Sequence, residues 1–203
     1  MRLIGITGGV GAGKTEVLKY IREHYRCEIY LADQVAHEVQ APGQPCYEAI
    51  VALLGQEIVK EDGSIDRAVM ASRIFGNPEL LQQVNGLVHP AVRSYIEARI
   101  EEARRKPEVE LFFIEAALLI EAGYKEIVDE LWYVYADAET RRSRLTANRG
   151  YTAERIEGIM SKQLTEEAFR ASCDFVIDNS GTLEESARQI DRRLEGCARR
   201  YEE

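Results

Sequence analysis

The segment GGVGAGKT at residues 8–15 matches the pattern G-x-x-x-x-G-K-[ST] and restricts what the surrounding chain can fold into. Glycines let successive backbone N–H groups turn towards one anion, and a helix that begins at the lysine adds its positive end. Such a loop needs a strand before it and a helix after it. Residues 2–7 (RLIGIT) are apolar and β-branched, and helix-forming residues follow from Lys14. This context favours a functional loop over a chance match, which average composition allows in about one chain in a hundred of this length.

The residue types in this loop predict a site for a nucleoside triphosphate. Lys14 supplies a compact positive charge for the β- and γ-phosphates, and the hydroxyl of Thr15 is suited to Mg²⁺. The predicted nucleotide-binding residues are Gly8, Gly9, Val10, Gly11, Ala12, Gly13, Lys14 and Thr15.

Five apolar runs, separated by helical segments, predict an α/β fold with a parallel sheet buried on both faces. The runs cover residues 2–7, 28–31, 109–116, 129–136 and 173–179. A capping-box spacing from Thr182 to Glu185 predicts the start of the last helix.

The interval between Leu31 and Val109 offers only helical segments, and it is too long for a plain crossover between strands. Asn-Pro at 77–78 and His-Pro at 89–90 are expected to separate these helices. We expect one domain over residues 1–203, with a core at 1–40, 107–140 and 173–203. A helical insertion for the acceptor is expected at about 41–106, and a lid at about 141–172.

Composition excludes several classes of protein. A net charge of −9 argues against general binding to nucleic acid, which needs a basic surface. The chain has no uninterrupted apolar stretch long enough for a membrane span, and a glycine-rich loop stands where a signal peptide needs its apolar core. A cytoplasmic protein is therefore expected.

The scattered cysteines and histidines suggest neither a disulfide framework nor a zinc site. The sequence does not indicate an oligomeric state.

Among proteins with such loops, a small phosphotransferase fits best. The guanine-selecting NKxD of a GTPase is missing, and the DxxG match at 178–181 follows the last strand, where it cannot sense a γ-phosphate.

A phosphotransferase should close over its ligands and bring cations to the transferred phosphoryl group. Arg149, beside a glycine hinge at Gly150, is the predicted lid cation. Arg141 and Arg142 are expected to belong to a solvated basic face.

Asp33 ends the run EIYLAD and allows two readings: a helix cap or a base that takes a proton from the substrate. If strand 28–31 pairs with strand 2–7, both end at the carboxyl edge, where such sheets bind ligands. Asp33 would then lie near the γ-phosphate, which favours the base. Glu115, at the end of another strand, is a candidate to assist Mg²⁺ through water.

Motifs along nearly the whole chain resemble the dephospho-CoA kinase family. In chain order they are ITGGVGAGKT, Ala32-Asp33, IFGNPELLQQVNGLVHPAV, EAALLIE at 115–121, RLTANRGYT at 144–152, Gln163 and DFVIDNSGT at 174–182. The resemblance implies a P-loop NTPase three-layer fold, like that of nucleoside-monophosphate kinases, with a five-stranded parallel sheet. It implies transfer of the ATP γ-phosphoryl group to the 3′-hydroxyl of dephospho-CoA, with ATP and Mg²⁺ as ligands.

By the same resemblance, Asp33 faces the ribose hydroxyl, and His89 and Arg93 lie on the acceptor side. Asn179 and Gly181 fall in the segment that contacts adenine. Two residues also have structural readings: His89 as a packing or capping histidine, and Asn179 as a turn residue.

Three positions differ from the family's usual pattern: Leu31 replaces an aspartate, Ala117 replaces a proline, and Glu16 replaces a second hydroxyl residue. Two alternative functions follow: a kinase for another nucleoside or nucleotide, and a non-catalytic ATP-binding regulator. The retained residues argue against the regulator: Lys14, Thr15, Asp33 and Arg149.

Overall fold

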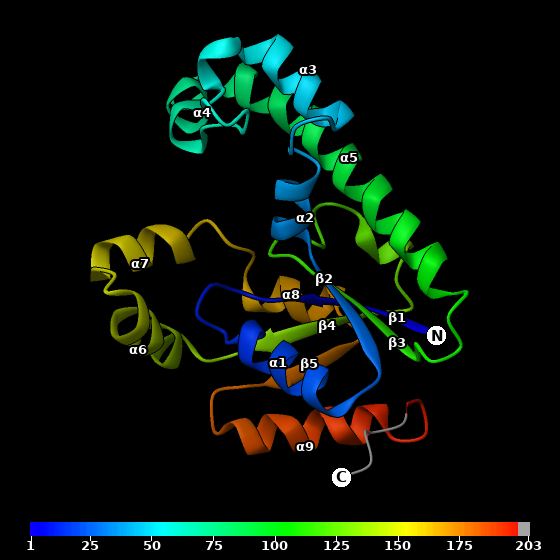
Figure 1. The fold of residues 1–203 in the computed structure, drawn as a ribbon. Helices are drawn as coiled ribbons and strands as arrows, with labels where there is room; N and C mark the ends of the chain where they lie inside the picture. Colours follow the sequence, from blue (N-terminus) through cyan, green and yellow to red (C-terminus); the bar gives the residue numbers. More distant parts are fainter. Residues whose placement is uncertain (199–203) are drawn as a thin grey trace. The chain divides into compact units, whose positions relative to one another are not determined.

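The computed structural model describes residues 1–198; the last five residues of the expected core segment 173–203 lie outside the described residues. The chain forms two compact units. The first, here the sheet unit, holds residues 1–29 and the chain from residue 103 onward. The second, here the helical unit, holds residues 30–102. Figure 1 shows the elements of both.

The five predicted strands are present, each within two residues of the predicted ends. They are β1 (Arg2–Thr7), β2 (Cys27–Leu31), β3 (Leu111–Glu115), β4 (Glu130–Tyr135) and β5 (Phe175–Asp178). They form one parallel sheet in the order β2-β3-β1-β4-β5. The predicted fold class, a P-loop three-layer fold with a five-stranded parallel sheet, is confirmed.

The order of strands corrects the expected pairing of β2 with β1, because β3 lies between them. β3 begins with four fully buried residues, LFFI, whereas every residue of β2 is partly exposed. A continuous apolar run is favoured in the middle of a parallel sheet, and a strand with polar residues at its edge. Pairing of β3 with β1 brings Ile6 opposite Glu115, so Glu115 lies beside the carboxyl end of β1, the strand that precedes the loop.

Helices cover both faces of the sheet (Figure 1). α1 (Lys14–His24) and α9 (Leu183–Leu194) lie together on one face, and α8 (Glu166–Ser172) lies against β4 on the other. α6 (Ala138–Arg149) and α7 (Ala153–Met160) follow β4, and a 3₁₀ turn, η2, covers Tyr124–Glu126. α9 begins with the predicted capping box of Thr182 and Glu185, which is confirmed.

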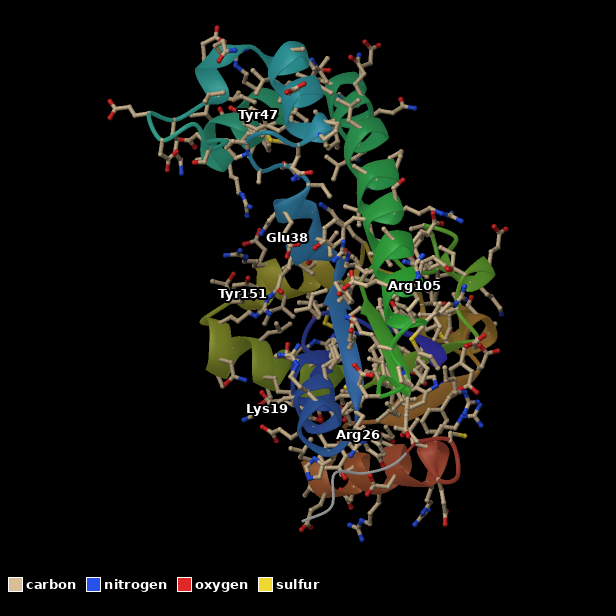
Figure 2. The ribbon with its side chains drawn as sticks, turned by 45° about the vertical axis from the view of Figure 1, so that its right-hand side comes forward. Lys19, Arg26, Glu38, Tyr47, Arg105 and Tyr151 are labelled. Carbon is tan, nitrogen blue, oxygen red and sulfur yellow. The ribbon has the colours of Figure 1, made fainter. Side chains whose placement is uncertain are left out.

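The helical unit consists of α2 (Ala32–Glu38), α3 (Pro45–Leu54), η1 (Gln56–Ile58), α4 (Arg67–Ile74) and α5 (Pro78–Ala103). The prediction of helices alone is nearly right: the exception is a short antiparallel bridge between Val59 and Ile65. Tyr47 on α3, labelled in Figure 2, donates a hydrogen bond of 2.8 Å to the carbonyl of Gly63 and fixes the turn inside this bridge.

The expected helix break at His-Pro 89–90 is wrong, because α5 runs through Pro90 without interruption. A proline inside a helix loses one backbone hydrogen bond and costs about 3 kcal/mol. α5 buries one apolar residue on each successive turn, and each such side chain contributes about 1.5–3 kcal/mol. This packing outweighs the cost of the proline. The buried residues of the stripe are Val84, Val88, Val92, Ile96 and Ile100.

Although α5 has 26 residues, many of them are charged or polar. Within residues 1–198, no helix unites the length and the apolar character that crossing a membrane requires.

A buried carboxylate, that of Glu130, connects the first strand and the last helix of the sheet unit. Glu130, at the start of β4, is only 7% exposed. Its oxygens accept hydrogen bonds from Arg2 on β1, from Arg193 on α9 at 2.7 Å and from the indole N–H of Trp132 at 2.7 Å. A buried charge is tolerated when such partners surround it, and its neutralisation leaves the partners unpaired.

We predict that Glu130→Gln lowers the free energy of unfolding by about 2 kcal/mol, because the amide keeps one acceptor oxygen but loses the negative charge shared by two arginines and turns an N–H group towards the remaining donors. Thermal unfolding should show a fall of about 4–8 °C in a chain of this size. The control is Glu166→Gln, which removes an exposed helical pair with Arg170 and should cost about 0.3–0.5 kcal/mol. Equal losses in the two variants would contradict this account of Glu130.

Candidate active site

The loop between β1 and α1 has the backbone that an anion-binding loop needs. Gly13 precedes α1 with φ of +91°, in the left-handed region that favours glycine. A Cβ at this position would lie 2.3 Å from Nδ2 of Asn179, so the close approach of Asn179 also requires glycine. No side chain caps the N-terminus of α1, and its first N–H groups can therefore serve a phosphate.

The carbonyl groups of the loop are held from the protein side. When the N–H groups of a loop turn towards one anion, the carbonyls turn the other way and need donors of their own. Four side chains supply them: Lys14 donates to Gly8 O at 2.8 Å, Arg141 to Val10 O at 2.8 Å, Asn179 to Ala12 O at 2.8 Å and Arg144 to Ala12 O at 3.4 Å.

Lys14 and Glu115 meet at the carboxyl end of the sheet. The ammonium of Lys14 lies 3.5 Å from a carboxylate oxygen of Glu115, and the two side chains are 15% and 16% exposed. Thr15 is exposed, and within residues 1–198 its hydroxyl makes no hydrogen bond. The set offers a cation, a carboxylate and a hydroxyl beside the loop, which fits a nucleotide phosphate with Mg²⁺. Elsewhere in residues 1–198, too, no three histidine, cysteine or acidic side chains come together in a cluster suited to a metal.

Arg141 is not part of a solvated face, and the sequence-based expectation for it is wrong. Its side chain is partly buried. Besides its hydrogen bond to Val10 O, the guanidinium donates a second hydrogen bond, of 2.5 Å, to Oε1 of Gln163. The same oxygen of Gln163 accepts the backbone N–H of Val10 at 3.3 Å. Burial lowers the pKa of Arg141, although guanidinium stays protonated in proteins. Arg142, the next residue, is exposed and pairs with Glu157, as expected.

Arg141 also explains the glycine at position 9. A Cβ on Gly9 would lie 2.4 Å from a terminal nitrogen of Arg141 and 2.9 Å from Oε1 of Gln163. The guanidinium thus rests directly over the backbone of the loop. The structure adds Arg141, Arg144 and Gln163 to the residues in contact with it.

Helix periodicity in the sequence indicates only in part which arginines of α6 face the loop. Leu145 is buried, with 1% exposure, and Arg141 and Arg144 precede it by four and one residues. Residues three and four apart share one helix face, so the spacing relates both Arg141 and Arg142 to Leu145. The contacts of the structure, and not the spacing, show that Arg141 faces the loop and that Arg142 pairs with Glu157 in solvent. Gln163 has no comparable signal in the periodicity.

Asn179 is buried, with 4% exposure, and both its amide nitrogen and its amide oxygen form hydrogen bonds within the protein. Its nitrogen donates to Ala12 O, and its oxygen accepts the hydroxyl of Ser186 at 2.8 Å. Gly181 is exposed, two residues later in the turn that leads to α9. The structure therefore gives Asn179 the role of tying this turn to the phosphate loop.

A hollow of about 500 Å³ lies at the start of α6. The backbone N–H of Asp137 donates to the hydroxyl of Ser180 at 3.0 Å, which places the hollow beside the turn that contains Asn179 and Gly181. The hydroxyl and N–H of Thr140 hold the pKa of Asp137 below its ordinary value. The lining residues are Asp137, Glu139, Thr140, Ser143 and Arg144.

Within residues 1–198, Arg149 forms no hydrogen bond or ion pair with the phosphate loop. It is exposed at the end of α6, before Gly150, which ends the helix with φ of +61°. Its guanidinium lies 6.0 Å from the ring centre of Tyr151, and that of Arg155 lies 3.9 Å from the same ring. Tyr151 is labelled in Figure 2.

In the helical unit, Asp33 is exposed in the first turn of α2. The cap interpretation is wrong: the capping residue is Leu31, and no side chain caps this helix. His37, one turn further along α2, accepts a hydrogen bond from Arg67. Partial burial and the charge of Arg67 lower the pKa of His37, whereas Asp33 raises it.

His89 and Arg93 lie one turn apart on α5. His89 is exposed and makes no hydrogen bond within residues 1–198, so neither packing nor capping accounts for it. Arg93 donates to Glu97 at 3.0 Å in an exposed helical pair.

Comparison with known proteins gives a consistent result. A family model described as dephospho-CoA kinase matches residues 2–185. A dephospho-CoA kinase from Geobacter metallireducens is 40% identical over 190 residues, which span 94% of each chain. A protein of known structure from Thermus thermophilus is 29% identical with a TM-score of 0.79, over 96% of both chains. A dephospho-CoA kinase from Campylobacter jejuni, 19% identical over 96% of both chains, has the same fold with a TM-score of 0.72. The chain belongs to the dephospho-CoA kinase family of ATP-dependent P-loop kinases.

Proposed function

We propose that this protein transfers the γ-phosphoryl group of ATP to the 3′-hydroxyl of dephospho-CoA, the last step of coenzyme A biosynthesis. The observation that carries the proposal is the phosphate loop with Lys14 and Glu115 at the carboxyl end of the sheet, in a chain whose family match spans residues 2–185. The acceptor is a small molecule.

In the proposed reaction, the 3′-oxygen of the ribose forms a bond to the γ-phosphorus, and the bond to the β,γ-bridging oxygen breaks. ADP leaves with that electron pair. Asp33 takes the proton of the attacking hydroxyl; its exposure on α2 leaves the carboxylate available. Lys14 stabilises charge on the β- and γ-phosphates. Thr15 would hold Mg²⁺, which neutralises charge on the phosphate oxygens.

The remaining candidate residues are assigned by their position. The hollow at the start of α6 has the volume of a small-ligand site and takes the adenine, with Gly181 beside it and Asn179 holding the turn. His89 and Arg93 bind the acceptor, since they share one face of α5. Arg149 acts as the lid cation, next to the αL residue Gly150.

The acceptor is tested by incubating the protein with ATP and Mg²⁺ against dephospho-CoA and a panel of nucleosides and nucleotides. Mass spectrometry should detect 3′-phosphorylated product from dephospho-CoA only. Lys14→Ala should abolish the product, because the charge at the β- and γ-phosphates is lost. Turnover of another acceptor without turnover of dephospho-CoA would refute the proposed substrate.

We predict that Asp33→Asn lowers turnover by about 10²- to 10⁴-fold, the usual contribution of a general base, and leaves ATP affinity unchanged. The control is Glu48→Gln, which also removes an exposed acid from the first turn of a helix in the same unit. Near-normal turnover of Asp33→Asn would show that Asp33 is not the base.

We predict that Asn179→Ala weakens ATP and GTP binding by the same factor and lowers the free energy of unfolding by about 1–3 kcal/mol. The reason is that Ala12 O and the Ser186 hydroxyl lose their common partner. Calorimetry and thermal unfolding measure both effects, with the exposed Asn148→Ala as control. A selective loss of ATP binding would instead indicate direct contact of Asn179 with the base.

A further inference from the structure

Arg141 carries a positive charge that no acidic side chain within residues 1–198 balances by an ion pair. Its acceptors are the carbonyl of Val10 and the amide oxygen of Gln163, both neutral. A partly buried cation without an acidic partner attracts an anion from solution. The neighbouring Arg142 shows the contrast, since it is exposed and paired with Glu157.

The position of Arg141 along the loop indicates which phosphates of ATP would lie near its guanidinium. The ammonium of Lys14 lies 2.8 Å from the carbonyl of Gly8, so the end of the loop near Gly8 is the end that serves the β- and γ-phosphates. Arg141 covers Gly9, the next residue. Arg144 and Asn179 contact the opposite end of the loop, at Ala12. Arg141 therefore stands with Lys14 at the terminal phosphates.

The amide oxygen of Gln163 indicates how a phosphate oxygen would be bound. It accepts two hydrogen bonds at once, from the guanidinium of Arg141 and from the backbone N–H of Val10. A loop N–H and an arginine that converge on one oxygen are the usual donors to a phosphate oxygen. After its bonds to Val10 and Gln163, the guanidinium of Arg141 still has N–H groups for a further acceptor.

We propose that Arg141 is a further catalytic residue, which donates to the γ-phosphate of ATP and stabilises the charge on the transferred phosphoryl group. The proposal rests on the proposed function only for ATP as phosphoryl donor and not for the identity of the acceptor. The guanidinium gives up no proton during the transfer. It contributes a fixed positive charge next to the oxygens on which negative charge is redistributed as the bond to the γ-phosphorus breaks.

The experiment compares Arg141→Gln with Arg142→Gln, the matched control on the same helix. Affinities for ATP and ADP are measured by calorimetry in the presence of Mg²⁺, and turnover is measured with saturating ATP. Arg141→Gln should weaken ATP binding about tenfold and ADP binding at most about twofold, and lower turnover about 10²- to 10³-fold. Arg141→Lys, which keeps the charge, should recover part of the ATP affinity. Arg142→Gln should change none of these values.

An equal weakening of ATP and ADP binding, or full turnover in Arg141→Gln, would overturn the proposal and leave Arg141 with the role of holding the loop. If Arg141→Gln does not fold, Gln163→Glu provides the test. This change keeps the acceptor oxygen but places a negative charge beside Arg141, so it should preserve thermal stability and lower turnover at least about tenfold. Unchanged turnover in Gln163→Glu would also overturn the proposal.

The affinity measurements need no acceptor, so the two proposals fail separately. A protein that does not turn over dephospho-CoA but loses ATP affinity relative to ADP in Arg141→Gln would support the role of Arg141 and refute the substrate. The opposite combination would support the substrate and refute the role of Arg141.

Discussion

The phosphate loop depends on how its carbonyl groups are satisfied. A backbone that turns its N–H groups towards an anion must turn its carbonyls into the protein, where each needs a donor. Here the donors are side chains of α1, α6 and the turn before α9: Lys14, Arg141, Arg144 and Asn179. Three separate parts of the chain therefore fix one short loop. Such contacts restrict the conformations of the loop and so reduce the entropy that is lost when it binds a ligand.

α6 links this loop to the part of the chain expected to act as a lid. One face of the helix carries Arg141 and Leu145 onto the loop, and Arg142 on another face remains in solvent. The helix ends at Arg149 and Gly150, where the backbone changes direction. One helix thus joins the part of the loop at Gly9 and Val10 to the cation predicted to close over the site.

The sequence predicts well those features that one segment determines by itself. The apolar runs give all five strands, and the GGVGAGKT pattern and the Thr182–Glu185 spacing give a loop and a helix start. Properties that depend on several segments are predicted less well. The place of β3 between β1 and β2 reflects the relative burial of three strands, and continuation of α5 through Pro90 reflects packing along the whole helix. The burial of Arg141 depends on Gln163, twenty-two residues away, which periodicity does not reveal.

The central position of β1 has a consequence for biosynthesis. Its partners, β3 and β4, begin more than a hundred residues later, and Asn179, which holds Ala12, is more distant still. Contacts of such high sequence separation form slowly. During translation the first strand and the glycine loop therefore wait, without their native neighbours, until most of the chain has left the ribosome. β1 is apolar, and an unpaired apolar strand favours aggregation of a partly synthesised chain.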